Sequence, residues 1–207
     1  MDLDRAFEES DLLAEQLLEL INVPSFDDSQ RIKVAGISCS LALEHWHAVR
    51  LLLQAGLLPA AAIIHRTQFD AIVRSIWLTH CASEPDIARL TAQLDSESEQ
   101  AAKNMASTHQ MMEEIAKRAP VEAHAALARF RDSSSKALNS YVHTGIHAIR
   151  RHEEGYPDGL VHAVLCSANG IAIVCGMQAV VLGGQQPLQR RVRSLSAMHS
   201  ACMPSPL

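Results

Sequence analysis

Apolar and polar residues along this 207-residue chain recur at intervals of three and four positions, which is the pattern of amphipathic α-helices. Runs of alternating β-branched residues bounded by hairpin turns are nearly absent. Signals that start or stop helices, such as capping residues, prolines and glycines, are frequent. The pattern therefore predicts an all-α protein, with helices in more than about 60% of its residues.

The start and stop signals divide the chain into seven expected helices. These helices span residues 2–21, 28–55, 59–82, 83–117, 120–130, 132–155 and 158–182. No internal repeat and no linker separates them, so we predict a single up-and-down bundle of six to seven helices in residues 1–184. Residues 185–207 are basic and then rich in proline and serine, and we expect this tail to be partly disordered.

Residues 160–182 are almost continuously apolar and precede three arginines, as in a membrane anchor. Four polar side chains interrupt the run, however, and would be costly in lipid. They are His162, Ser167, Asn169 and Gln178. We therefore expect a buried helix of the bundle and no membrane contact.

Composition indicates a soluble cytoplasmic protein. The net charge of −5 argues against broad, non-specific nucleic-acid binding through a basic surface, although a local basic patch stays open. The five cysteines are widely spaced and form no CxxC motif, which indicates buried thiols in a reducing compartment. The first sixteen residues are acidic and amphipathic, unlike a signal peptide, so we expect the protein in the cytoplasm.

The most informative segment is residues 136–152. Wound as a helix, it gathers five polar side chains into one arc beside an apolar stripe, because residues three and four apart share a face. The arc consists of Lys136, Asn139, His143, His147 and Arg150. Any functional site is expected first on this arc.

A second candidate is a ladder of alternating charge. Arg66, Asp70 and Arg74 recur at four-residue spacing beside an apolar stripe. The structural interpretation is that each arginine covers apolar surface and pairs with a carboxylate. The functional alternative is that Asp70 orients an imidazole of the arc, as carboxylates do for catalytic histidines.

Metal-binding patterns are incomplete. His143 and His147 stand at i, i+4 and could share a metal, but a third ligand is required. The candidates for it are Asp70, Glu44 and Glu153. Glu44 and His47 form the i, i+3 pair of di-iron bundles, yet no second such pair exists, so an ion pair between helices is the simpler explanation. We expect no resident metal or cofactor, and the nucleophile and phosphate-loop motifs are also absent.

The segment from Asn139 to His143 resembles the motif of HEPN domains. These are small all-α bacterial and archaeal domains of RNase toxins, phage-defence proteins and nucleotide-binding modules. The preceding segments SLALEHWHAVRLLLQAG and HRTQFDAIVRSIWL resemble uncharacterised bacterial families grouped with HEPN, and the similarity covers about residues 38–181. In the family, an arginine, often followed by asparagine, precedes a histidine by about five positions. Leu138 stands where that arginine would be.

The resemblance implies an HEPN-like fold and roles for the arc. In a family dimer the histidine assists proton transfer and the arginine binds phosphate. When the family motif is aligned with this segment, Asn139 and His143 match its asparagine and histidine, and no residue takes the role of its arginine. Candidates to replace the missing charge in space are Arg66, Arg74 and Arg150. We assign catalytic roles to His143, Asn139 and Asp70, and ligand binding to Lys136, His147, Arg150, Arg66, Arg74 and Glu44.

The leading hypothesis is a bacterial stress- or defence-associated homodimer that binds RNA or a nucleotide, with weak or absent RNase activity. The RNase hypothesis needs a phosphate-binding arginine near His143. The alternatives are a non-catalytic module that binds a partner protein, which needs an exposed apolar patch and no cleft, and a bundle that binds a metal or small ligand. The last needs a third metal ligand within reach.

Overall fold

The computed structural model describes residues 2–204, except for the side chain of Ser135. This range forms ten α-helices and a short 3-10 helix, with no strand, and is 80% helical. In chain order they are α1 (Leu3–Ile21), α2 (Gln30–Gln54), α3 (Leu58–His80), α4 (Glu84–Thr91), α5 (Ser96–Ala102), α6 (Thr108–Arg118), α7 (Val121–Val142), α8 (Ile146–Glu154), α9 (Asp158–Leu182), α10 (Leu188–Met198) and η1 (Ser200–Cys202). The predicted all-α class is confirmed, and the described helices outnumber the six or seven expected.

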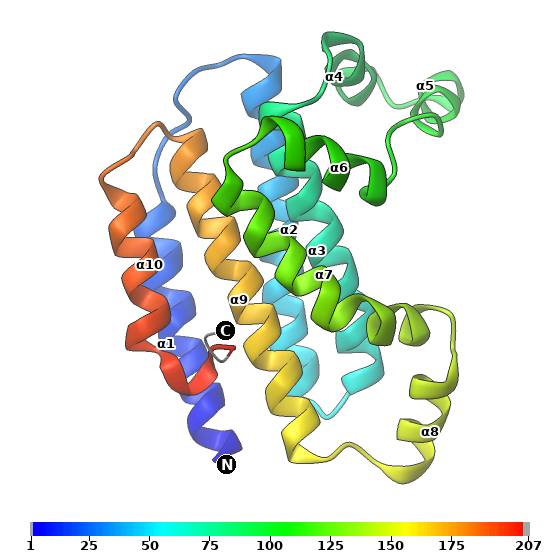
Figure 1. The fold of residues 1–207 in the computed structure, drawn as a ribbon, viewed down its shortest axis with the longest axis vertical. Helices are drawn as coiled ribbons and strands as arrows, with labels where there is room; N and C mark the ends of the chain where they lie inside the picture. Colours follow the sequence, from blue (N-terminus) through cyan, green and yellow to red (C-terminus); the bar gives the residue numbers. More distant parts are fainter. Residues whose placement is uncertain (1, 205–207) are drawn as a thin grey trace.

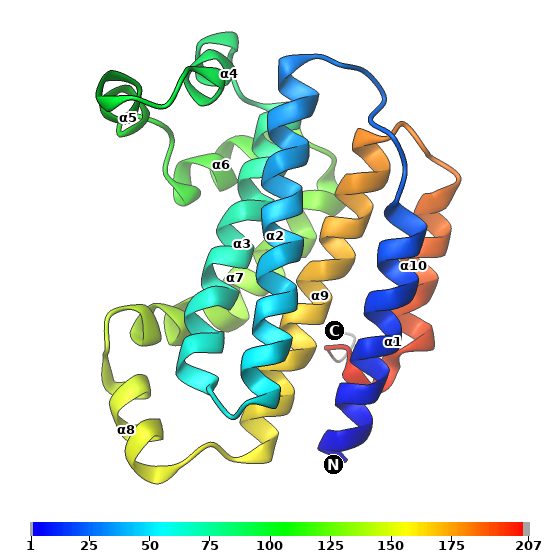
Figure 2. The ribbon, with the colours of Figure 1, turned by 180° about the vertical axis from the view of Figure 1, so that it is seen from behind.

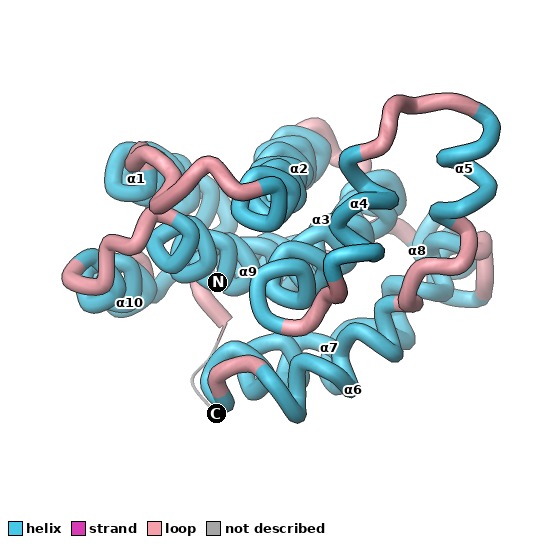
Figure 3. The backbone as a smooth tube through the Cα atoms, turned by 90° about the horizontal axis from the view of Figure 1, so that it is seen from above, coloured by secondary structure: helices cyan, strands magenta, loops and turns pink. Residues whose placement is uncertain are grey.

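Helix α9 is the centre of the bundle. It packs against α1 and α10 on one side and against α2, α3 and α7 on the other (Figures 1 and 3). By length and composition alone α9 could cross a membrane. Its packing partners give it the surroundings of a buried bundle helix, as the sequence predicted.

The four polar residues that interrupt α9 all have hydrogen-bonding partners. Asn169 is fully buried, accepts from Ser10 Oγ at 3.0 Å and Trp46 Nε1 at 2.8 Å, and donates to the Cys202 carbonyl at 2.9 Å. The others bond within the same bundle: His162 with the Ala201 carbonyl, Ser167 with His65, and Gln178 with Thr79. Each would lose these partners in lipid, so the polar groups fix α9 within this bundle.

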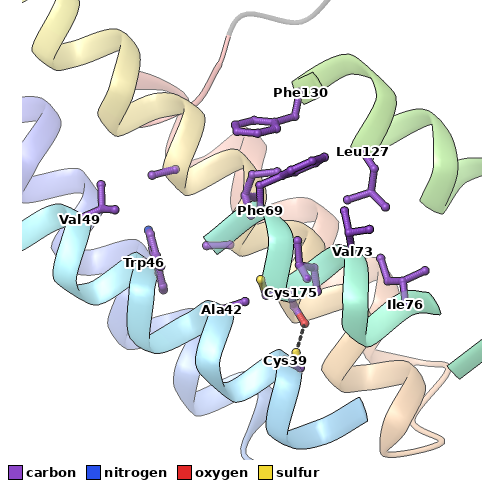
Figure 4. Packing of buried hydrophobic residues seen from close by; sticks show 14 of the residues in the cluster. Cys39, Ala42, Trp46, Val49, Phe69, Val73, Ile76, Leu127, Phe130 and Cys175 are labelled. Atoms are coloured by element: carbon purple, nitrogen blue, oxygen red, sulfur yellow. Dashed lines mark hydrogen bonds between the residues drawn. The ribbon is translucent and has the colours of Figure 1, made fainter. Parts of the chain in front are cut away.

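The core is built from the apolar stripes of α2, α3, α7 and α9. Phe69 of α3 stacks on Phe130 of α7, with ring centroids 4.5 Å apart. Figure 4 shows these rings beside Leu127 of α7, with Val73 and Ile76 of α3 below them. This packing positions α7, and with it the motif region, against α3.

The polar region of residues 83–117 forms three short helices in place of the single helix predicted. A capping box at Ser83 and Asp86 starts α4, at the position where the sequence predicted a helix to begin. Two further capping boxes, at Asp95 and Ser107, start α5 and α6. Side chains that bond to nearby backbone N–H groups favour helix starts over helix interiors, so they divide the segment. Only α6 packs closely on α3, through Met111, Met112 and Ile115.

Helix α7 runs unbroken through residues 130–133, where a boundary between two helices was predicted. The chain instead breaks after Val142. Thr144 has a φ of 51°, and the Gly145 N–H donates to the Ser140 carbonyl at 2.6 Å. A left-handed residue ends a helix because it turns the backbone out of the helical path.

The basic tail contains a packed helix, contrary to the disorder expected for residues 185–207. Val192 and Leu195 of α10 are buried. After α10, the buried His199 ring bonds to Glu9 Oε2 at 2.8 Å and Gln16 Oε1 at 3.1 Å, which ties the tail to α1. The end of that predicted tail, residues 205–207, lies outside the described residues.

Candidate functional site

The polar arc does not form one helical face. Asn139 belongs to α7, His143 caps that helix, and His147 and Arg150 belong to α8. Ser140 Oγ accepts from the His147 backbone N–H at 3.1 Å, and the His147 ring lies on Tyr141 with centroids 6.5 Å apart. Because the helix breaks between them, the predicted i, i+4 geometry of His143 and His147 is wrong.

A polar cluster does form where α3 faces α7 and α6, and Arg66 is its centre. Arg66 Nε donates to Asn139 Oδ1 at 3.2 Å, and an Arg66 guanidinium nitrogen forms a salt bridge with Asp70. Thr108 Oγ1 of α6 also donates to Asp70 Oδ1, at 2.8 Å. The side chains of Arg66 and Asp70 are 20% and 36% exposed, so a ligand from solvent can reach the cluster.

Leu138 explains why the guanidinium comes from another helix. Its side chain is buried on the core side of α7. Asn139, one residue later, is exposed and faces Arg66. A long charged side chain at position 138 would meet the core, whereas Arg66 reaches the asparagine from α3.

Asp70 does not orient an imidazole of the arc, as one hypothesis predicted. Its hydrogen-bonding partners among the described side chains are Arg66 and Thr108. His143 is exposed and forms no side-chain hydrogen bond with a described residue. The site therefore contains no acid–base pair of the kind that activates a nucleophile.

The other predicted ligand-binding residues lie at different places in the fold. Lys136 is exposed on α7, one turn before Asn139, whereas Arg74 is half-buried on α3 with no salt bridge to the described residues. Arg150 points to its own helix, where it pairs with Glu153 and Glu154. Glu44 is exposed on α2, away from the cluster.

The metal-binding hypotheses gain no support from the geometry. Glu44 and His47 are both exposed, and neither forms the ion pair expected for them within residues 2–204. No group of three or more histidine, cysteine or acidic side chains in that range is arranged to hold a metal ion. All five cysteines are buried free thiols, as their spacing predicted.

Sequence reasoning missed a buried network around His65. Its Nδ1 lies 2.8 Å from Gln68 Oε1, its Nε2 lies 3.1 Å from Ser167 Oγ, and Gln68 Nε2 donates to the Ala168 carbonyl. Burial lowers the pKa of His65 to about 4, although the Gln68 hydrogen bond opposes the shift. The signal was present, since His65 and Gln68 lie at i, i+3 on the apolar side of α3. Ligands cannot reach this network, which joins α3 to α9.

The chain belongs to a family of unknown function, DUF6988, whose model matches residues 39–205. No curated protein and no solved structure matches the chain. The matched range contains Arg66, Asp70 and the α7–α8 motif, whereas α1 precedes it. Since the function of the family is unknown, functional inference rests on the site itself.

Proposed function

We propose that the protein is an HEPN-like RNA- or nucleotide-binding protein in which Arg66 replaces the arginine missing from position 138. The supporting observation is the 3.2 Å contact between Arg66 Nε and Asn139 Oδ1, which joins a guanidinium to the motif asparagine. A guanidinium held at a solvent-accessible position binds phosphate well, because its fork of donors matches phosphate oxygens. Lys136 adds a second positive charge on the same helix as Asn139.

Binding is better supported than catalysis. Asp70 already neutralises Arg66, and no described residue bonds to the His143 ring to set its tautomer. A phosphate ligand therefore competes with Asp70 for the guanidinium. We expect weak or undetectable cleavage of RNA, and binding that depends strongly on salt.

A homodimer is part of this proposal. Val142, Ile146 and Ile149 are exposed beside the motif, and Ile146 is 72% accessible. An apolar group in this position suits an interface between two copies of the chain, which would bring two clusters together.

The test is fluorescence anisotropy with a labelled single-stranded RNA at several salt concentrations. Arg66→Ala and Lys136→Ala should each weaken binding about tenfold and reduce the slope of log K against log salt by roughly 0.7. Arg193→Ala, an exposed arginine of α10, is the control with the same loss of charge. If all three variants weaken binding equally, or the wild type does not bind in low salt, the phosphate site is wrong.

The same apolar group favours one alternative, a non-catalytic module that binds a partner protein. Two cavities of the described chain lie away from Asn139 and His143, the larger where α1 faces α2, Leu58 and Val161, and the smaller between α1, α2 and α9. Ile146→Glu separates the proposals. We expect it to convert a dimer into a monomer in sedimentation experiments, whereas a wild type that is monomeric and does not bind RNA would favour the partner module.

A further inference from the structure

The seam between α1 and α2 lies on the side of the bundle away from α7, and it is called the groove below because two hollows open along it. Both helices pack on α9 but scarcely on each other (Figure 2). Two hollows lie along this groove, one of about 750 Å³ and one of about 520 Å³. The larger is near the start of α1 and the smaller near its end.

Each hollow has an apolar base. Leu53 and Leu58 are buried beneath the larger hollow, where Phe7 and Val161 are half-buried. Leucine and isoleucine side chains of α1, α2 and α9 line the smaller hollow, together with Val23 after the end of α1. The half-buried Phe7 and Val161 and the exposed Leu18 leave part of this apolar surface open to a ligand.

Every charged side chain that lines the two hollows is acidic. Asp4, Glu8 and Asp11 line the larger hollow, and Glu19 lines the smaller. Asp11 pairs with Arg50 of α2, but the other three form no salt bridge within the described chain. The free carboxylates favour a cationic occupant.

The carboxylates follow the axis of the groove. They recur on one side of α1 from Asp4 to Glu19, a length of roughly 22 Å at 1.5 Å per residue. That length corresponds to about four helical turns. A helix with an apolar face and a basic edge would fill both hollows and meet the carboxylates.

We propose that this groove docks a basic amphipathic helix of a partner protein, a function separate from phosphate binding at Arg66. A second copy of the chain fits less well. Its basic helix α10 already buries Val192 and Leu195. Its helix α8 does expose Ile146 and Ile149, but α8 has only nine residues, and its Arg150 is already paired with Glu153 and Glu154.

Two substitutions test the groove without disturbing the fold. Gly36 lines the smaller hollow, and a Cβ built there meets nothing within 4 Å, so Gly36→Leu fills the hollow. Glu8→Lys reverses a charge on the rim. The matched controls are Gly159→Leu, where a Cβ also meets nothing, and Glu122→Lys on exposed α7.

The probe is a labelled 14-residue helical peptide of leucine and lysine, with a leucine–glutamate peptide as its opposite. The basic peptide should bind the wild type, about tenfold more weakly after Glu8→Lys and about fivefold more weakly after Gly36→Leu. The controls should change affinity less than about twofold. Circular dichroism should show all four variants folded. Leucine favours a helix over glycine, and the two substituted glutamates are exposed.

Three outcomes would overturn the proposal. Equal binding of the acidic peptide would remove its charge basis, and unchanged affinity in Gly36→Leu would mean that the peptide only coats the acidic surface. The third is a homodimer abolished by Gly36→Leu, which would make a second copy the occupant. None of these results affects RNA binding through Arg66, so the two proposals fail independently.

Discussion

Two asparagines show how differently this protein uses the same side chain. Asn169 lies in the middle of α9, where it is fully buried and bonds to three other segments. Asn139 lies on the outer side of α7, where it is exposed and accepts from Arg66. In the first region polar groups specify the packing of helices, and in the second they remain available to a ligand.

The largest expected effect comes from breaking the buried region. Asn169→Ala leaves the Trp46 indole N–H and the Cys202 carbonyl without partners, and should lower the free energy of unfolding by about 3–5 kcal/mol. Urea denaturation measures the change. Asn139→Ala is the matched substitution and should cost less than about 1 kcal/mol, since its site is exposed. Equal losses would erase the distinction between the two regions.

The buried His65 should make stability depend on pH. Its pKa of about 4 in the folded protein lies below the ordinary value of 6.5, so between these values the unfolded chain binds the extra proton. Stability should therefore fall as pH drops from 6.5 to 4, by about 3 kcal/mol in total, and be unaffected by this group above 6.5.

Denaturation at a series of pH values tests this dependence. His65→Gln should flatten the profile between pH 6.5 and 4, whereas His143→Gln on the exposed motif should leave it unchanged. An identical slope in wild type and His65→Gln would contradict the assignment.

Asp70 links stability to the proposed function. Asp70→Ala removes the Arg66 salt bridge and the Thr108 hydrogen bond in a partly exposed setting, so it should lower the free energy of unfolding by about 1–2 kcal/mol. It also frees the Arg66 guanidinium, and RNA affinity should rise. Anisotropy and thermal melting on one sample measure both effects. A variant that loses stability and RNA affinity together would show that Asp70 positions Arg66.

The smallest effect is expected at the turn between α7 and α8. Thr144 has a φ of 51°, which a β-branched residue adopts at a cost. Thr144→Gly should relieve that strain and raise stability by roughly 0.5–1 kcal/mol after the entropy of glycine in the unfolded chain is counted. A lower melting temperature would mean that the threonine side chain stabilises the turn.

The fold was largely predictable because local signals set where helices begin and end. The predicted helix starts at residues 2 and 83 and the predicted end at residue 182 agree with the observed limits of α1, α4 and α9. The polar segment of residues 83–117 was misread, since its aspartates and serines could be interior residues or caps. Only the resulting backbone distinguishes these uses.

For the candidate site, the sequence predicted which residues take part but not how they are arranged. Spacing singled out Asn139, Arg66 and Asp70, and their convergence was raised as one alternative. His143, His147 and Arg150 were grouped on the assumption of one continuous helix, which the turn at Thr144 interrupts. A single left-handed residue redirects every side chain after it, and sequence periodicity carries no sign of that event.

The sequence by itself determined the helical class, the burial of α9 and the free state of the five thiols, because helix propensity and apolar periodicity act over neighbouring residues. Tertiary structure decided that Arg66 of α3 meets Asn139 of α7, and that α1 and α2 leave a groove over α9. Arg66 and Asn139 are 73 positions apart in the sequence, and Asp11 of α1 and Arg50 of α2 are more than 30 positions apart. Contacts over such separations depend on how whole helices pack. Packing sums many weak interactions over large surfaces, so no local pattern contains it.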